Sequence, residues 1–372
     1  MSRSRLLFIG CITISFAVAA SAFHGPLPPS AGVGSVVPAG QMIEPRSGQT
    51  ATLLSDGRVL IVGGMRRNQD FSKSAELYDP ATGKFQLTGE MSLGRVGQVA
   101  VLLRSGKALI AGGWIGGHST TDSAELYDPA TGKFTVIGKL TTRRARPSAT
   151  LLTDGNVLLT GGADHDGPDG AVASVEIFRA EAARFQPTGS LHRPRSGQTA
   201  TLLKDGRVLI AGGGSGGLIS TAELYDPKTG TFTETGSLNT PRHKHTAGLL
   251  ADGRVLIAGG SDARDWHGTM NSAEIYDPHT GEFTATSPLN DSRFKLPDEA
   301  VQLSNGKLLI AGGSKEVEVF DPVRAKFFVA AGQMNDARHF MSETRLKDGG
   351  VLLAGGYANN DQATAQAWIY RP

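Results

Sequence analysis

Cysteine is almost absent from this chain of 372 residues, in which Cys11 is the only one. A single thiol cannot form a disulfide within the chain, so the fold cannot depend on covalent cross-links. Its stability must therefore come from packing, and a chain of this length can bury a substantial hydrophobic core.

Neither sign of charge is in clear excess. The chain has 37 Lys and Arg residues against 35 Asp and Glu residues, with a formal net charge of +2. No block or stripe of basic residues interrupts this balance. Nucleic acids and anionic membrane surfaces attract proteins through such basic patches. The composition therefore argues against both as partners.

Long hydrophobic runs are also lacking, with one exception at the N-terminus. Arg3 and Arg5 precede an apolar run from Leu6 to Ala20, and Ala20-Ser21-Ala22 has the small side chains of a signal-peptide cleavage site. The run is too short for a transmembrane helix. We therefore expect a signal peptide over residues 1–22, a flexible segment over residues 23–32 and an exported protein, either secreted or periplasmic.

Cys11 leaves one alternative open for this leader. The residues Phe8-Ile9-Gly10-Cys11 resemble the box at which bacterial lipoproteins are lipidated. Only Leu6 to Ile9 precede the cysteine as an apolar region, which is shorter than such leaders usually have. We therefore favour removal of the whole leader, with a lipid anchor on Cys11 as the alternative.

Glycine, by contrast, is abundant, with 49 residues, and much of it belongs to an internal repeat. A Gly-Gly pair recurs seven times at intervals of roughly fifty residues, a period typical of propellers. The pairs are Gly63-Gly64, Gly112-Gly113, Gly161-Gly162, Gly212-Gly213, Gly259-Gly260, Gly312-Gly313 and Gly355-Gly356. We therefore expect seven copies of one structural unit over residues 33–372.

Each copy reads as four short strands. In the first copy they are Thr50 to Leu54, Arg58 to Val62, Ala75 to Tyr78 and Lys84 to Thr88, with apolar runs or alternating faces. Asp56-Gly57 between the first two strands is a strong hairpin signal, because glycine adopts positive φ without strain. The predicted fold is thus all-β, a seven-bladed β-propeller with four-stranded antiparallel blades.

The seventh copy ends at Tyr370-Arg371-Pro372 and lacks a fourth strand. Near the N-terminus, Gly40-Gln41-Met42 aligns with Gly89-Glu90-Met91 of the first copy, which places Val36 at the position of the fourth-strand aromatic Phe85. We therefore expect residues 34–38 to pair beside the last strand and close the ring. Closure removes an unpaired sheet edge that would favour association.

The motif pair VLIxGG and AELYDPxTGxF resembles the kelch repeat, over about residues 33–372. The third copy departs from it, reading VEIFRAEAARF. The resemblance implies the propeller fold but covers several functions: copper oxidases such as galactose oxidase, sialate mutarotases, and binding adaptors. The oxidases need a cysteine cross-linked to a tyrosine. Without its leader this chain has no cysteine, so that copper site cannot form. We expect no other cofactor.

A basic residue precedes the first strand of each copy, and a glutamate lies in most third strands. The basic residues are Arg46, Arg95, Arg144, Arg195, Arg242, Lys295 and Arg338. The glutamates are Glu76, Glu125, Glu176, Glu223, Glu274 and Glu318. A ring of cations for an acidic ligand is one interpretation. A repeated structural ion pair explains both series at once, and we prefer it.

Histidines lie in the same leading loops, the loops before each first strand. They are His243, His245 and His339, with Asp298 at a matching place. They either converge as acid-base or metal-binding groups, or occupy the position that holds Gln49, Gln98 and Gln198 in other copies. No metal-binding spacing is present, so we expect no metal. We likewise interpret the acidic segment from Asp164 to Gly170 as a solvated turn and not as a calcium loop.

The loops after each Gly-Gly pair share no pattern, and two of them carry tryptophan, Trp114 and Trp266. A scaffold with uniform blades and one variable rim presents a specific surface at that rim. We therefore predict a monomeric binding module for an unknown protein or glycan. The alternative is an exported carbohydrate-active enzyme resembling sialate mutarotases. The candidate ligand-binding residues are Trp266, His243, His245, Arg242, His339, Arg338 and Trp114.

Overall fold

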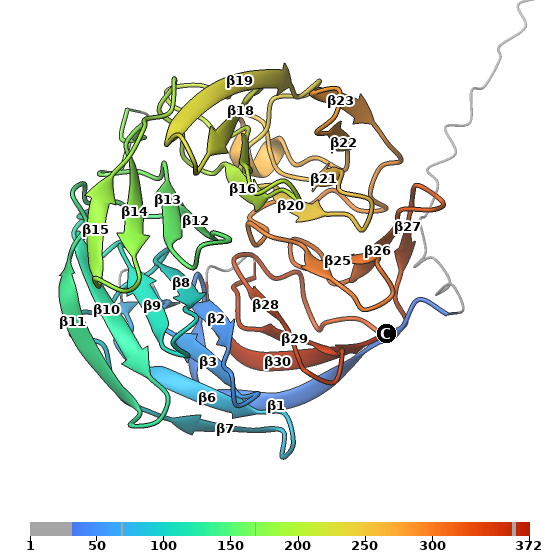
Figure 1. Ribbon diagram of the computed structural model, residues 1–372. Coiled ribbons are helices and arrows are strands. Elements are labelled where there is room, and N and C mark those ends of the chain that lie inside the picture. Colours follow the sequence, from blue (N-terminus) through green and yellow to red (C-terminus); the bar gives the residue numbers. More distant parts are fainter. Residues whose placement is uncertain (1–31, 68–69, 168, 359–361) are drawn as a thin grey trace, which may run out of the picture.

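The computed structural model of the chain describes residues 32–67, 70–167, 169–358 and 362–372. Seven four-stranded antiparallel sheets stand around a central axis, as Figure 1 shows. The all-β class and the seven blades expected from the repeat are both confirmed.

Blades 1 to 4 follow the chain from the innermost to the outermost strand. Blade 1 comprises β2 (Thr50–Leu53), β3 (Val59–Val62), β6 (Ala75–Asp79) and β7 (Lys84–Leu87), and blade 2 comprises β8 (Val99–Leu102), β9 (Ala108–Ala111), β10 (Ser123–Asp128) and β11 (Lys133–Lys139). Blade 3 comprises β12 (Ser148–Leu151), β13 (Val157–Thr160), β14 (Val175–Arg179) and β15 (Arg184–Pro187), and blade 4 comprises β16 (Thr199–Leu202), β17 (Val208–Ala211), β18 (Thr221–Asp226) and β19 (Thr231–Ser237).

Blades 5 to 7 complete the ring. Blade 5 comprises β20 (Thr246–Leu249), β21 (Val255–Ala258), β22 (Ala273–Asp277) and β23 (Glu282–Ala285), and blade 6 comprises β24 (Val301–Gln302), β25 (Leu308–Ile310), β26 (Glu318–Asp321) and β27 (Lys326–Val329). Blade 7 comprises β28 (Ser342–Arg345), β29 (Val351–Ala354), β30 (Thr364–Arg371) and, from the N-terminal side, β1 (Ser35–Arg46). A small hairpin, β4 (Met65–Arg67) with β5 (Asp70–Phe71), and a 3₁₀ turn, η1 (Asp265–His267), lie in the loops.

The strand β1 closes the ring as predicted. Val36 pairs with Tyr370 in an antiparallel register, just as Phe85 pairs with Tyr78 in blade 1. The hydroxyl of Tyr370 also donates a hydrogen bond of 2.6 Å to the carbonyl oxygen of Val33. In Figure 1 the blue β1 lies alongside the red β30, so the first and the last of the described strands share one sheet.

The core lies within and between the blades. The second strands are fully buried, and in blades 1 to 6 the third-strand aromatic packs on the fourth-strand aromatic of its own blade, as with Tyr78 and Phe85 at 4.8 Å between ring centres. Tyr127 of blade 2 packs with Leu54 and Leu60 of blade 1, which shows the expected contact between blades. Among the described residues, no helix is long and apolar enough to cross a membrane.

Six ion pairs hold the leading loops to the blades. Each joins a buried arginine to the buried third-strand glutamate at 2.6 to 3.0 Å. The pairs are Arg46–Glu76, Arg95–Glu125, Arg144–Glu176, Arg195–Glu223, Arg242–Glu274 and Arg293–Glu318. The structural interpretation of the two series is therefore confirmed.

One member of the basic series was assigned wrongly from the sequence. In blade 6 the arginine of the ion pair is Arg293 and not Lys295. The segment between Arg293 and β24 is longer than its counterparts, and the added length shifts the alignment. In blade 7, where Trp368 replaces the glutamate, Arg338 donates to Gln366 and lies over the Trp368 ring.

Candidate binding site at the centre of the ring

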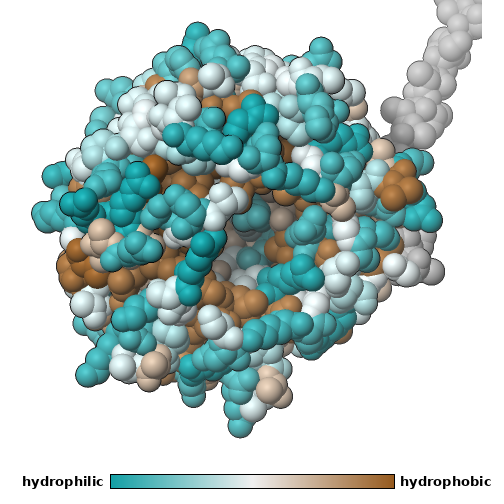
Figure 2. Space-filling model, viewed as in Figure 1, coloured by the Kyte–Doolittle hydropathy of each residue, from teal (hydrophilic) through white to brown (hydrophobic). Residues whose placement is uncertain are grey.

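Seven leading-loop residues, one from each blade, surround the central axis. Each follows two residues after the arginine described above, and we call this set the collar. Its members are Gly48, Gly97, Arg146, Gly197, Lys244, Lys295 and Phe340. All seven line one central cavity of about 930 Å³. Figure 2 shows the ring hollowed at its centre.

The collar residues share an unusual backbone conformation. Their φ angles lie between 50° and 69°, in the left-handed region. Backbone hydrogen bonds link neighbouring members: Gly48 donates to the carbonyl of Phe340 at 2.8 Å, Gly97 to Gly48 at 3.1 Å and Arg146 to Gly97 at 2.7 Å. Lys244 donates likewise to Gly197, and Phe340 to Lys295, each at 2.9 Å. Backbone hydrogen bonds therefore join the leading loops of different blades to one another at the collar.

Glycine suits this conformation, and three blades use it. Arg146, Lys244, Lys295 and Phe340 adopt it with side chains, which costs about 1–2 kcal/mol per residue. Such strain persists where the surroundings impose it, and it gathers at functional sites. The four strained residues all line the cavity. The gathering of these four strained residues therefore makes the cavity the candidate ligand-binding site.

Two of the collar cations are held by neighbours on the rim. Lys244 lies 2.6 Å from the carboxylate of Asp265. Lys295 donates to the Tyr357 hydroxyl at 2.9 Å and stands 3.9 Å from the centre of the Trp266 ring. Burial alone would raise the pKa of Asp265, but the hydrogen bond from Lys244 and the charges of both lysines lower it. Asp265 therefore stays ionised beside the two lysines.

The opposite sign of charge lies on blades 6 and 7. The longer segment of blade 6 carries Asp298 and Glu299 past Ala247 of β20, with the amide of Ala247 donating to the carbonyl of Asp298 at 3.2 Å. Blade 7 adds Glu343, where the corresponding residues of blades 1 to 5 are alanines such as Ala51. All three carboxyl groups line the central cavity. They give it an acidic wall below the cationic collar.

Two of these carboxyl groups are weak acids. Asp298 is open to water in the cavity, yet the protein surrounds it, and this desolvation raises its pKa to about 7 against the opposing charge of Arg146. Burial raises the pKa of Glu343 to about 8, opposed by the hydrogen bond that the Ala311 amide donates to it. Near neutral pH the wall therefore carries less negative charge than its residue count indicates.

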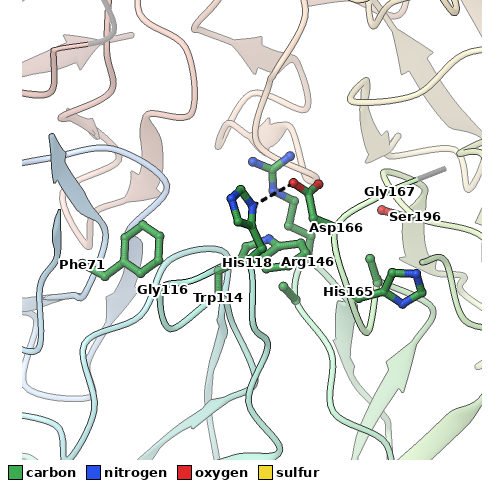
Figure 3. Close-up of a pocket in the computed structure, with 11 residues that line it drawn as sticks. Phe71, Trp114, Gly116, His118, Arg146, His165, Asp166, Gly167 and Ser196 are labelled. Atoms are coloured by element: carbon green, nitrogen blue, oxygen red, sulfur yellow. Dashed lines mark hydrogen bonds and ion pairs between the residues drawn. The ribbon is translucent and has the colours of Figure 1, made fainter. Parts of the chain in front are cut away.

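A second cavity of about 400 Å³ adjoins the first, and Figure 3 shows it. Phe71, Trp114 and Arg146 line both cavities. His118 and Asp166, from the loops of blades 2 and 3, are 3.1 Å apart at its rim. The two cavities together form a continuous recess around Arg146.

The structure divides the predicted site residues into two groups. Trp266, His339, His243 and Trp114 belong to the loops around the recess. Trp266 is 40% exposed and packs edge-on against His339 at 4.7 Å, while Trp114 lines both cavities. His243 lies 3.6 Å from Asp265, and burial followed by the charge of Lys244 lowers its pKa to about 4. Its imidazole is therefore neutral at physiological pH.

Arg242, His245 and Arg338 form the second group, and they are buried in the scaffold. Arg242 bonds Glu274, and Arg338 bonds Gln366. His245 takes the position of Gln198 and shares a hydrogen bond of 3.1 Å with Thr199 of the preceding blade. Their predicted role in ligand binding has not been tested, but these contacts explain their presence, and we leave them out of the candidate site.

Sequence reasoning passed over Arg146, Lys244, Phe340 and Glu343, and it placed Lys295 in the wrong series. A signal for the collar was present. The residue two places after each leading-loop arginine is glycine in three copies and a cation or phenylalanine in four. Position alone, however, did not reveal that these residues share one cavity.

The residues that the structure describes contain no group of three or more His, Cys, Asp or Glu side chains placed to hold a metal. In the acidic segment of blade 3, His165 lies 2.5 Å from Asp164 and 3.3 Å from Asp169, and all three side chains are exposed. This agrees with the interpretation of that segment as a solvated turn.

Comparison with known proteins places this chain by its repeats and fold. No curated protein matches it. A structure described as a novel fungal alcohol oxidase with catalytic diversity among the AA5 family, in complex with copper, superposes with a TM-score of 0.73. That match covers 91% of this chain and 76% of the other at 16% identity, so it shows a shared fold alone.

The family comparison bears directly on the repeats. The model of the kelch motif matches residues 46–92, 98–141 and 243–290, which correspond to the first, second and fifth copies. The third, fourth and sixth copies form blades of the same strand order in the same ring, and the seventh copy does so with β1 as its fourth strand. This chain therefore contains kelch motifs in three of its seven copies and folds as a seven-bladed β-propeller.

Proposed function

We propose that this kelch propeller is an exported binding module that takes its ligand at the collar, on the face formed by the leading loops and the loops after each Gly-Gly pair. The observation that carries the proposal is the collar itself. Four side chains adopt a strained backbone conformation where glycine serves in three other blades, and all four line one central cavity.

The recess has the composition of a ligand site. Aromatic side chains, Trp114 and Phe71, lie beside charged groups of both signs in a cavity of about 930 Å³. Ligand pockets typically combine apolar walls with a few polar groups in volumes of this order. The partner that this favours is a small molecule or the end of a glycan or protein chain, because the groups lie within a recess.

A second candidate function is that of an exported carbohydrate-active enzyme. The observation that favours it is Asp298, a water-accessible carboxyl group. Desolvation raises its pKa to about 7, although the charge of Arg146 opposes this shift. A general acid or base works best with a pKa near the working pH. Residue roles beyond this do not follow from the geometry, so binding remains our first proposal.

The experiment is a screen of purified residues 23–372 on a glycan array and against a library of small metabolites. Each hit is then measured with the variants Trp266→Ala, on the proposed face, and Asp56→Ala, in a hairpin turn. Binding should weaken in Trp266→Ala alone. Loss in Asp56→Ala alone would place the site on the other face. Turnover of a bound glycan, followed by NMR, would favour the enzyme.

A further inference from the structure

Arg146 differs from the other cations of the collar in having no protein acceptor. Its side chain is exposed within the recess, and it forms no hydrogen bond or ion pair with any described residue. The guanidinium lies over the Phe340 ring, with its carbon atom 4.2 Å from the ring centre. Lys244 and Lys295, by contrast, are both engaged by groups on the rim. The guanidinium of Arg146 therefore points into the recess with its donors free.

The surroundings hold Arg146 in this position. A Cβ atom on Gly97 would lie 3.0 Å from Cγ of Arg146 and 3.6 Å from the Trp114 ring, so the arginine side chain crosses directly over a glycine. The Phe340 ring supports the guanidinium on one face by a cation–π contact. A free surface arginine would sample many rotamers, whereas this one is confined between two blades.

A guanidinium placed in this way suits one kind of ligand group. Its N–H donors form a planar fork that matches the two oxygens of a carboxylate or phosphate. The bond gains strength in a recess partly shielded from water. The nearby lysines of the collar add to the positive potential, while Asp265 offsets part of it.

The acidic wall constrains the rest of the ligand. Asp298, Glu299 and Glu343 line the same cavity and would repel a second anionic group. Carboxyl groups accept hydrogen bonds when ionised and donate them when protonated, so hydroxyl groups satisfy them in either state. The recess thus favours a single anionic group on a hydroxylated body.

We propose that Arg146 anchors an anion-binding site and that the ligand is a small hydroxylated molecule carrying one carboxylate or phosphate group. This rests on the proposed binding function, for which it names the ligand class. The free guanidinium, its confinement over Gly97 and its place in the cavity carry the inference together.

The variant Arg146→Gly tests the site directly, because glycine is the residue of three other blades at this position and suits its φ of 50°. Titration calorimetry would measure glucuronate, glucose 6-phosphate and glucose against the wild type, Arg146→Gly, Arg146→Lys and Arg143→Gln. Arg143 is an exposed arginine close by in the chain and serves as the control.

We expect at least one anionic probe to bind the wild type, with Arg143→Gln unchanged. Arg146→Gly should bind it at least about tenfold more weakly, since the variant loses the charge-assisted hydrogen bonds of the guanidinium. Arg146→Lys should fall between, because it keeps the charge and loses the fork. A preference for glucuronate would identify a sugar acid, and a preference for glucose 6-phosphate a phosphate ester.

Equal affinity of Arg146→Gly and wild type would overturn the site, and equal binding of glucose would overturn the anionic class. Failure of both anions to bind at millimolar concentration would overturn the class as well. The broader binding function would survive that failure if a ligand from the array still depended on Trp266. Thermal melting of each variant would confirm folding, and Arg146→Gly should melt no lower than wild type.

Discussion

The guanidinium of Arg146, on blade 3, lies 4.2 Å from the ring centre of Phe340, on blade 7. These blades are not neighbours in the ring, so the contact reaches across the central cavity. Both residues adopt the left-handed conformation, with φ of 50° and 52°. The contact therefore depends on all seven blades closing correctly, and it ties the candidate site to the integrity of the ring.

Substitution of a collar glycine by alanine should destabilise the protein more than the same substitution at a glycine of similar φ outside the collar. Gly48 has φ of 63° and a Cβ there would lie 2.6 Å from Val96, whereas Gly83 has φ of 67° with nothing within 4 Å. Gly83→Ala should lower the free energy of unfolding only by the cost of the left-handed backbone conformation, about 1–2 kcal/mol. Gly48→Ala should lower it clearly more, because its Cβ would also clash with Val96. Urea unfolding of both variants measures this, and equal losses would count against a packed collar.

Removal of one partner of a buried ion pair should be strongly destabilising. Glu223 lies 2.6 Å from Arg195, and both side chains are buried. Glu223→Ala would leave the Arg195 charge unpaired, at a cost of about 3–5 kcal/mol. Glu90→Ala, which removes an exposed partner of Lys73, should cost about 1 kcal/mol or less. Similar denaturation midpoints for the two variants would refute the structural role.

Deletion of residues 34–38 should open the ring. These residues include Val36, which is buried and pairs with Tyr370, so their loss exposes the edge of β30. Unpaired edges favour association between chains. We expect a lower melting temperature and larger species in size-exclusion chromatography. A truncated protein that stays monomeric and melts with the wild type would disprove closure by β1.

Stability should fall as the pH rises, in part through Glu343. Its pKa is raised to about 8 in the folded protein from an ordinary value of 4.5, chiefly by burial. The folded state therefore keeps a proton that the unfolded chain loses, so the contribution of Glu343 to stability is fully present below pH about 5 and is lost as the pH rises to about 8. The Ala311 amide and Arg293 oppose the shift. The other charged groups of the cavity are Arg146, Lys244, Lys295, Asp298 and Glu299.

Glu343→Gln removes this titration and keeps an oxygen for the Ala311 amide. The variant should melt at least about 2 °C above wild type at pH 9 and close to it at pH 4.5. Glu90→Gln, at an exposed glutamate, should show no such dependence. A constant difference between Glu343→Gln and wild type at both pH values would exclude the proposed titration.

Features that depend on nearby residues were predictable from the sequence. Asp56-Gly57 predicts its hairpin because the residues that determine a turn lie within four positions of one another. A Gly-Gly pair, Gly63-Gly64 in the first copy, marks the end of the second strand in each copy. Repetition extends this reach. The match of Val36 to Phe85 predicted ring closure between the two ends of the chain, because identical units impose identical neighbours.

The sequence by itself thus determined the blades, their number, their closure and the repeated arginine–glutamate pair. Only the tertiary structure decided which residues face the central cavity. Because the segment of blade 6 is longer, the sequence alignment assigned Lys295 to the ion pair that Arg293 forms. The same segment places Asp298 in the cavity, and no local sequence pattern predicts where an added loop folds. Arg146 and Phe340 meet because seven rigid blades bring distant loops to one axis, and such convergence is a property of the closed ring, not of any segment in it.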